Sequence, residues 1–135
     1  MTEGQGVQIS DGRSGVRLKR TGCVNELGHP TLIDVQAGPF TGGVLGETVD
    51  FGYFRTQLTK LYEVLSGTAI LVSYDGLKLV LVGNGRGAIE VKVEITAQHV
   101  PLIQLIFEFE IDQTYLPPII KQLDEEFPPP YRIAL

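Results

Sequence analysis

The sequence has little of what secreted and membrane-spanning proteins need. Its one cysteine, Cys23, cannot form an internal disulfide, which favours a reducing compartment. No apolar run approaches the roughly 18 residues of a membrane span. Residues 1–10 also lack the basic start and the apolar stretch of a signal peptide. We therefore expect a cytoplasmic protein that does not associate with membranes.

Basic residues are scarce as well. Lys and Arg number 11 against 16 Asp and Glu, and the formal net charge at pH 7 is −5. A protein that binds a phosphate backbone normally presents a basic surface, so direct binding to nucleic acid is not expected. An acidic protein is better suited to a basic protein partner.

What the chain does have is a globular composition. Hydrophobic residues make up 43% of its 135 residues and charged residues 20%. A chain of this length can bury roughly two thirds of its unfolded surface without disulfides or metals. No repeat or linker interrupts it. We expect a single domain over residues 1–135, with residues 1–6 disordered.

Short alternating segments predict an antiparallel β-meander sheet of about six to eight strands. The expected strands cover residues 7–10, 15–20, 31–37, 40–46, 68–74, 77–82, 88–96 and 102–112. In the last of these, the residues from Ile103 to Ile111 alternate between an apolar face and a polar one. One buried face and one wet face are typical of antiparallel sheets.

Two segments have a helical period instead. Apolar residues in segment 50–66 form one stripe, with Asp50 suited to cap the helix and Gly67 to close it. Segment 116–127 carries a second stripe, and its two prolines stand in the first turn, where they are tolerated. The predicted class is therefore α+β, an antiparallel sheet packed by a central and a C-terminal helix.

Four glutamates are the most conspicuous polar set. Glu108 and Glu110 share one strand face, and Glu90 and Glu94 are expected on the same face of the neighbouring strand, with Lys92 among them. Paired carboxylates can perform acid–base chemistry on glycosides. That chemistry also requires a cleft that raises one pKa, and the pattern indicates none. A solvated face is the simplest interpretation, and an acidic partner-binding surface is the alternative.

Other candidate sites are weaker. Cys23, His29 and Asp34 are the residue types of a nucleophile, a base and an orienting group, but no nucleophile elbow surrounds the cysteine. His29 and His99 stand far apart and lack nearby ligand pairs. We therefore predict no catalytic residue, no metal site and no cofactor, and we do not expect an enzyme.

The glycine-rich segment 83–87 superficially resembles a phosphate-binding loop. It lacks the Lys-Ser/Thr pair and the following helix of that motif. Its alternate glycines most simply supply positive φ angles to a hairpin turn, and the alternative is that Arg86 binds an anion or a partner. Farther along, Asp112 or Thr114 is expected to accept amide hydrogens at the start of the final helix.

Several motifs follow one another in a distinctive order. They are Leu61-Tyr-Glu-Val-Leu-Ser-Gly67, the Asp75-Gly76 hairpin, Val82-Gly-Asn-Gly-Arg-Gly-Ala-Ile89 and Phe107-Glu-Phe-Glu-Ile-Asp-Gln-Thr-Tyr-Leu116. Over roughly residues 35–127, this order resembles the WapI-like immunity proteins and related small bacterial domains. The resemblance implies an α+β fold. It also implies a non-enzymatic binding protein that neutralises a cognate, contact-dependent toxin by direct contact.

The expected partner is therefore a toxin domain, and the protein is expected to be a monomer or a homodimer. The candidate partner-binding residues are Glu90, Glu94, Glu108, Glu110 and Arg86. Two other functions stay open. A small-ligand-binding domain would have a deep pocket between sheet and helix. An enzyme would have a titratable cluster with strongly shifted pKa values in a cleft.

Overall fold

The computed structural model describes residues 6–23, 28–48, 51–73 and 76–128. These residues form eight strands, one short 3-10 helix and two α-helices. The elements are β1 (Val7–Ser10), β2 (Ser14–Arg20), β3 (His29–Ala37), β4 (Phe40–Thr48), α1 (Phe51–Val64), β5 (Ser66–Val72), β6 (Leu77–Asn84), β7 (Ala88–His99), β8 (Leu102–Asp112), η1 (Gln113–Tyr115) and α2 (Leu116–Glu126).

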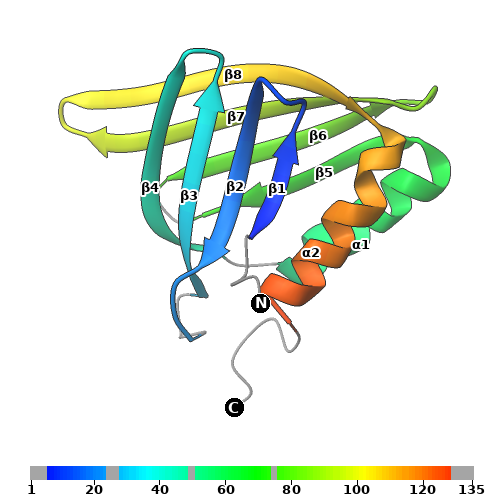
Figure 1. Cartoon of the computed structure of the whole chain (residues 1–135), viewed down its shortest axis with the longest axis horizontal. Helices are drawn as coiled ribbons and strands as arrows, with labels where there is room; N and C mark the ends of the chain where they lie inside the picture. Colours follow the sequence, from blue (N-terminus) through cyan, green and yellow to red (C-terminus); the bar gives the residue numbers. More distant parts are fainter. Residues whose placement is uncertain (1–5, 24–27, 49–50, 74–75, 129–135) are drawn as a thin grey trace.

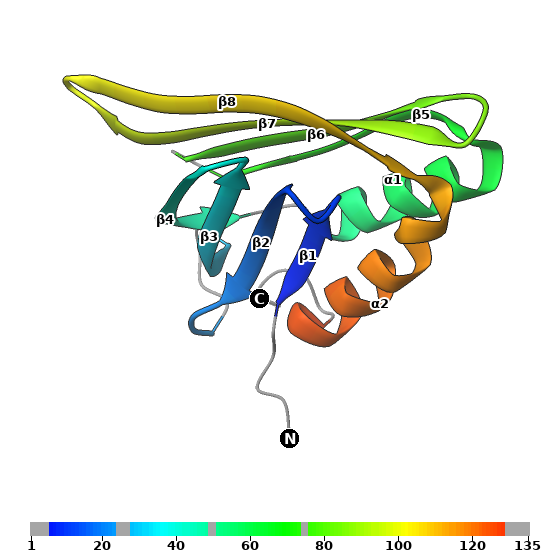
Figure 2. The same cartoon turned by 45° about the horizontal axis from the view of Figure 1, so that its top comes forward.

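The strands divide into two antiparallel sheets of four. The first has the order β1-β2-β3-β4 and the second β5-β6-β7-β8, so within each sheet consecutive strands of the chain are paired. The first sheet lies across one face of the second, with its strands crossing those of the second sheet steeply (Figures 1 and 2). The α+β class and the eight strands predicted from the sequence are confirmed. The division into two sheets is a feature that alternation alone does not specify.

A continuous hydrophobic core joins the two sheets and the helices. Alternate residues of each strand point into it, as the period of two requires. The innermost side chains include Ile9, Leu18, Ile33, Leu71, Leu79, Leu81 and Ile89, all with less than 2% of their surface exposed. Each such side chain stabilises the fold by about 1.5–3 kcal/mol relative to exposure, before packing effects are counted.

The two helices lie side by side and close one end of the sheet pair (Figure 1). Helix α1 packs on β5, and α2 packs beside β1. Their buried residues follow the predicted stripes, namely Phe51, Phe54, Leu58 and Leu61 in α1 and Leu116, Ile119 and Leu123 in α2. Between the helices, the Arg55 guanidinium donates to both carboxylate oxygens of Asp124, at 2.6 and 2.9 Å.

Helix α1 ends earlier than the sequence predicts. Its last residue is Val64, and Leu65 adopts a left-handed conformation with φ 63°, which glycine would adopt more easily. Ser66 already pairs with Asn84, so the next strand begins before Gly67 can close the helix. The prediction that Gly67 ends the helix is therefore wrong. The predicted cap Asp50 lies outside the described residues.

Other boundaries differ by a few residues. Strand β3 begins at His29, two residues before the predicted strand 31–37, and α2 ends one residue before its predicted end. The two prolines of α2 do stand in its first turn, as predicted. The disorder predicted for residues 1–6 falls outside the described residues except at Gly6, which is buried. Neither α1 nor α2 is long and apolar enough to cross a membrane.

The hairpin of β7 and β8 is longer than its neighbours. Strand β6 begins at Leu77, opposite Ile95, so among the residues that the structure describes no third strand pairs with the far end of the hairpin. A bulge interrupts the pairing between Thr96 and Gln98. The hairpin tip projects past β4 in both views (Figures 1 and 2), and Val100 at the tip is 89% exposed.

Candidate partner-binding face

The outer face of the second sheet carries the four predicted glutamates. The pairing of β7 with β8 sets Glu90 directly opposite Glu110 and Glu94 opposite Ile106. Glu108 stands opposite Lys92 in the row between them. Their inward-pointing neighbours along both strands are core residues. The prediction that these carboxylates share one face of two neighbouring strands is confirmed.

This face has an excess of negative charge. The Nζ of Lys92 lies 3.6 Å from Oε1 of Glu90, and both side chains are about half exposed. Lys78 of β6 stands opposite Glu94. Four carboxylates therefore share the three central rows of β6, β7 and β8 with two lysines. A pair this exposed is screened by water and salt, so the lysines neutralise the face incompletely.

Apolar side chains border the acidic rows. Ile70 and Val72 on β5 are 42% and 41% exposed, and Ile106 on β8 is 62% exposed. Ile70 pairs with Val80 and Val72 with Lys78, which places all of them on the same outer face. Protein-binding surfaces contain both apolar and charged side chains, and this face presents both.

A hollow of about 450 Å³ lies at the end of the sheet where β7 begins and β8 ends. Arg86, Glu110, Asp112, Thr114 and Tyr115 are among the residues that line it. The hollow therefore joins Arg86, predicted from the glycine-rich turn, to one of the predicted glutamates and to segment 112–115. Sequence reasoning placed Arg86 in a different motif from Glu110 and segment 112–115, because only the strand register brings the two motifs together.

The turn that carries Arg86 is a tight hairpin. The side-chain oxygen of Asn84 accepts hydrogen bonds from the amides of Arg86 and Ala88, at 2.7 and 3.2 Å. Gly85 and Gly87 have φ angles of 83° and 103°, which only glycine adopts without strain. The interpretation of this segment as a hairpin turn is confirmed. The role of Arg86 stays a prediction.

Asp112 builds the opposite wall of the hollow. Its Oδ1 accepts hydrogen bonds from the amide of Thr114, at 2.7 Å, and from the Thr114 hydroxyl. These two bonds, the hydroxyl bond first, lower the pKa of the Asp112 carboxyl from its ordinary value. Asp112 thereby caps the short helix η1. The predicted cap of the final helix is not formed, because α2 has Tyr115 at its N-cap and no side-chain hydrogen bond there. The adjoining Gln113 amide donates to the carbonyl of Gly87 at 2.8 Å and ties the two walls together.

The structure separates the residues of the weaker candidate sites. The His29 ring is buried and meets the stacked rings of Phe51 and Phe127 edge-on, with centroids 5.2 and 5.4 Å away. Asp34 points to the outer face of the first sheet, and Cys23 is exposed in a connecting segment. The described residues contain no group of three or more His, Cys, Asp or Glu side chains placed to hold a metal ion.

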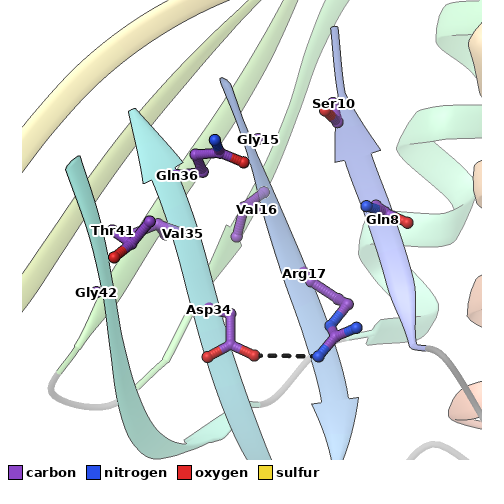
Figure 3. A pocket seen from close by; sticks show the side chains of 10 residues that line it. All are labelled: Gln8, Ser10, Gly15, Val16, Arg17, Asp34, Val35, Gln36, Thr41 and Gly42. Carbon is purple, nitrogen blue, oxygen red and sulfur yellow. Dashed lines mark hydrogen bonds and ion pairs between the residues drawn. The ribbon is translucent and has the colours of Figure 1, made fainter. Parts of the chain in front are cut away.

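A second hollow of about 450 Å³ lies on the outer face of the first sheet (Figure 3). Arg17 and Asp34 point toward each other across its floor, 3.4 Å apart. Gly15 and Gly42 also line it and, having no side chains, leave room there. This hollow is open and lies on a sheet face. The ligand-binding alternative predicted a pocket between sheet and helix.

Comparison with known proteins identifies the family. The profile of the immunity protein WapI-like family matches residues 29–129, from the first residue of β3 to just beyond α2. The chain belongs to this family. No curated protein and no solved structure matches it. The family resemblance inferred from the order of the sequence motifs is thus confirmed.

The extent of the match separates the two hollows. The matched residues 29–129 include Arg86, segment 112–115 and the four glutamates of the outer sheet face. The hollow on the first sheet takes part of its lining from β1 and β2, which precede that region. The matched region therefore contains the whole lining of the hollow beside Arg86, but only part of the lining of the hollow on the first sheet.

Proposed function

We propose that the protein is a cytoplasmic immunity protein that neutralises a cognate toxin by binding it directly, without catalysis of its own. One observation carries the proposal. Within the region that matches the family, four glutamates share one exposed sheet face, and a hollow with Arg86 adjoins its end. We define the acidic face as the surface formed by Glu90, Glu94, Glu108 and Glu110.

Electrostatics supports a basic partner. A toxin that acts on nucleic acid presents a basic cleft, because its substrate is a polyanion. An acidic face opposite such a cleft accelerates encounter and sets the orientation of the two proteins. The net charge of −5 acts in the same direction over the whole molecule. Association should therefore slow as ionic strength rises.

Exposed apolar side chains beside the acidic face can supply the affinity that exposed charges do not supply. Affinity comes mainly from a few well-packed side chains that lose water, while charges contribute specificity and speed. Ile70, Val72 and Ile106 border the acidic face and can be covered by the same partner. Arg86 adds a cation at the rim of the hollow, where it can pair with an acidic residue of the toxin.

The test is direct binding, measured by calorimetry. The titrant is an inactivated C-terminal domain of any large secreted protein encoded beside this gene. We expect a submicromolar one-to-one complex that Glu90→Lys and Glu108→Lys weaken roughly tenfold or more. Glu63→Lys changes an exposed residue of α1 and is the matched control. A folded toxin domain, active before its inactivation, that does not bind would contradict the proposal.

A second candidate function is the binding of a small polar ligand in the hollow of the first sheet. The facing pair of Arg17 and Asp34 favours it, with Gln8, Gln36 and Thr41 around them (Figure 3). A thermal-shift screen of small polar metabolites tests it. Two results together would favour this function over immunity. A ligand would raise the melting temperature of the natural protein but not that of Arg17→Ala, and the natural protein would not bind the toxin domain.

A further inference from the structure

Strand β8 ends the second sheet, and no other strand in the described part of the chain pairs with its outer edge. It spans eleven residues and pairs with β7 on one side. Its other edge lies at the margin of the molecule, beyond the rest of the sheet (Figures 1 and 2). Leu102–Asp112 contains no proline, lysine or arginine, the residues that most often protect a sheet edge. An edge of this kind is a template for another extended chain.

The side chains along this edge change character from one end to the other. On the outer face the order is Leu102, Gln104, Ile106, Glu108 and Glu110, apolar near the hairpin tip and acidic near η1. On the inner face, burial decreases toward the tip. Ile111 is 4% exposed, whereas Ile103 is 51% exposed. A strand laid against β8 would therefore meet carboxylates at one end and uncovered apolar side chains at the other.

A second copy of this chain is a poor occupant. Its β8 would bring two more glutamates to an outer face where Glu90 and Glu110 already stand opposite each other. It would bring no cation, because β8 contains no lysine or arginine. Each copy also carries a net charge of −5. The carboxylates thus discourage self-pairing and leave the edge open to a cationic strand.

We propose that β8 receives an extended segment of the cognate toxin as a fifth strand of the second sheet. The segment carries Lys or Arg at alternate positions beside Glu108 and Glu110. It carries apolar residues beside Ile106 and, on the inner face, beside Leu105 and Phe107, which are half-buried in the free protein. This inference rests on the proposed function and specifies how the toxin is held.

Strand addition divides the work of recognition between backbone and side chains. The free amides and carbonyls of β8 pair with the backbone of the incoming segment, which supplies affinity for extended chains in general. The acidic end of the row selects basic side chains and fixes the register, because a one-residue shift would turn them to the opposite face. Contact with the acidic face alone would leave the β8 backbone unpaired.

Amide hydrogen exchange, followed by nuclear magnetic resonance, tests this directly. The full-length protein is compared alone and with the inactivated C-terminal domain of the neighbouring secreted protein. We expect every second amide of β8, those pointing away from β7, to exchange quickly in the free protein and at least about tenfold more slowly in the complex. The double variant Glu108→Lys, Glu110→Lys should lose this protection together with binding. The control Glu63→Lys should keep both.

The outcomes distinguish this inference from the proposed function. A tight complex without new protection in β8 overturns strand addition and leaves the immunity function standing. The absence of any complex overturns both. Light scattering that shows a dimer of the protein alone, with the β8 amides already protected, assigns the edge to a second copy and also overturns the inference. Because lysines could disturb folding, Glu108→Gln with Glu110→Gln serves as a second variant and should weaken binding by a smaller factor.

Discussion

Glu90 of β7 and Glu110 of β8 lie directly opposite each other, so two carboxylates occupy one cross-strand pair on an exposed sheet face. Like charges in this position destabilise a sheet. Lys92 lies within 3.6 Å of the Glu90 carboxylate and leaves the repulsion incompletely relieved. A repulsive carboxylate pair that lowers stability fits a surface whose negative charge is neutralised by the cations of a binding partner. Stability and binding should therefore respond oppositely to its removal.

The variant Glu110→Lys tests this opposition. It replaces the repulsive pair with an attractive one, so the free energy of unfolding should rise by a few tenths to about 1 kcal/mol in urea titrations. Affinity for the toxin domain should fall in the same variant, because a carboxylate of the acidic face becomes a cation. A variant that loses stability would show that the Glu90–Glu110 repulsion does not matter in the folded protein.

Acid should weaken the cap of η1. The pKa of Asp112 is held below its ordinary value of 3.8, first by the Thr114 hydroxyl and then by the Thr114 amide. A lowered folded-state pKa contributes stability that is complete above 3.8 and disappears as pH falls through the lowered value. The variant Asp112→Asn should therefore be less stable than the natural protein at neutral pH. The difference should vanish in strong acid.

Urea titrations from neutral pH to about pH 2 measure this difference. Asp11 provides a parallel case, since amide hydrogen bonds from Ser14 and Arg13 lower its pKa in the same way. Asp11→Asn should show the same pH dependence at an independent site. A gap between natural protein and Asp112→Asn that persists unchanged into strong acid would rule out the hydrogen-bonded carboxylate as its cause.

Local patterns in the sequence predict most of the elements but not their assembly. The bounds of β8 follow from its alternation, because a period of two leaves little freedom in a strand with one buried face. The end of α1 does not follow from local signals. Gly67 looks like a helix terminator, yet the pairing of Ser66 with Asn84 forces Leu65 into the left-handed region. Tertiary pairing thus overrides the local preference.

The candidate site shows the same limit. The shared face of the four glutamates could be predicted, since residues two apart on a strand point the same way. The meeting of Arg86 with Glu110 and Asp112 could not, because it depends on how the β6–β7 turn and the end of β8 are placed by register. Alternation tells which side chains face inward. It does not indicate that β1 to β4 form a sheet separate from that of β5 to β8.

Gly83 should tolerate no side chain. A Cβ built there would lie 2.6 Å from the Leu61 side chain and 2.6 Å from the Leu65 carbonyl oxygen. The carbonyl is backbone at the end of α1, so it cannot rotate away. We expect Gly83→Ala to lower the free energy of unfolding by about 1–3 kcal/mol, measured in urea titrations.

Gly42→Ala is the control. The new methyl group, also in a strand, would meet only the Val35 side chain, at 4.0 Å. The stability of this variant in urea should match that of the natural protein. Equal losses in the two variants would mean that α1 does not approach β6 closely.

Phe127 should be the residue on which the docking of α2 depends most. Its ring is fully buried and stacks on that of Phe51, with centroids 4.0 Å apart, while the His29 ring meets it edge-on. Removing a buried aromatic ring from such a cluster costs about 3–5 kcal/mol, a large part of the 5–15 kcal/mol that stabilises an ordinary domain. Phe127→Ala should therefore show a strongly reduced urea midpoint.

Phe127→Leu is the control. It keeps most of the apolar volume and should lower the free energy of unfolding by about 1 kcal/mol. Two equal and small losses would mean that the ring is not packed, and that α2 is held mainly by its other buried residues, Leu116, Ile119 and Leu123.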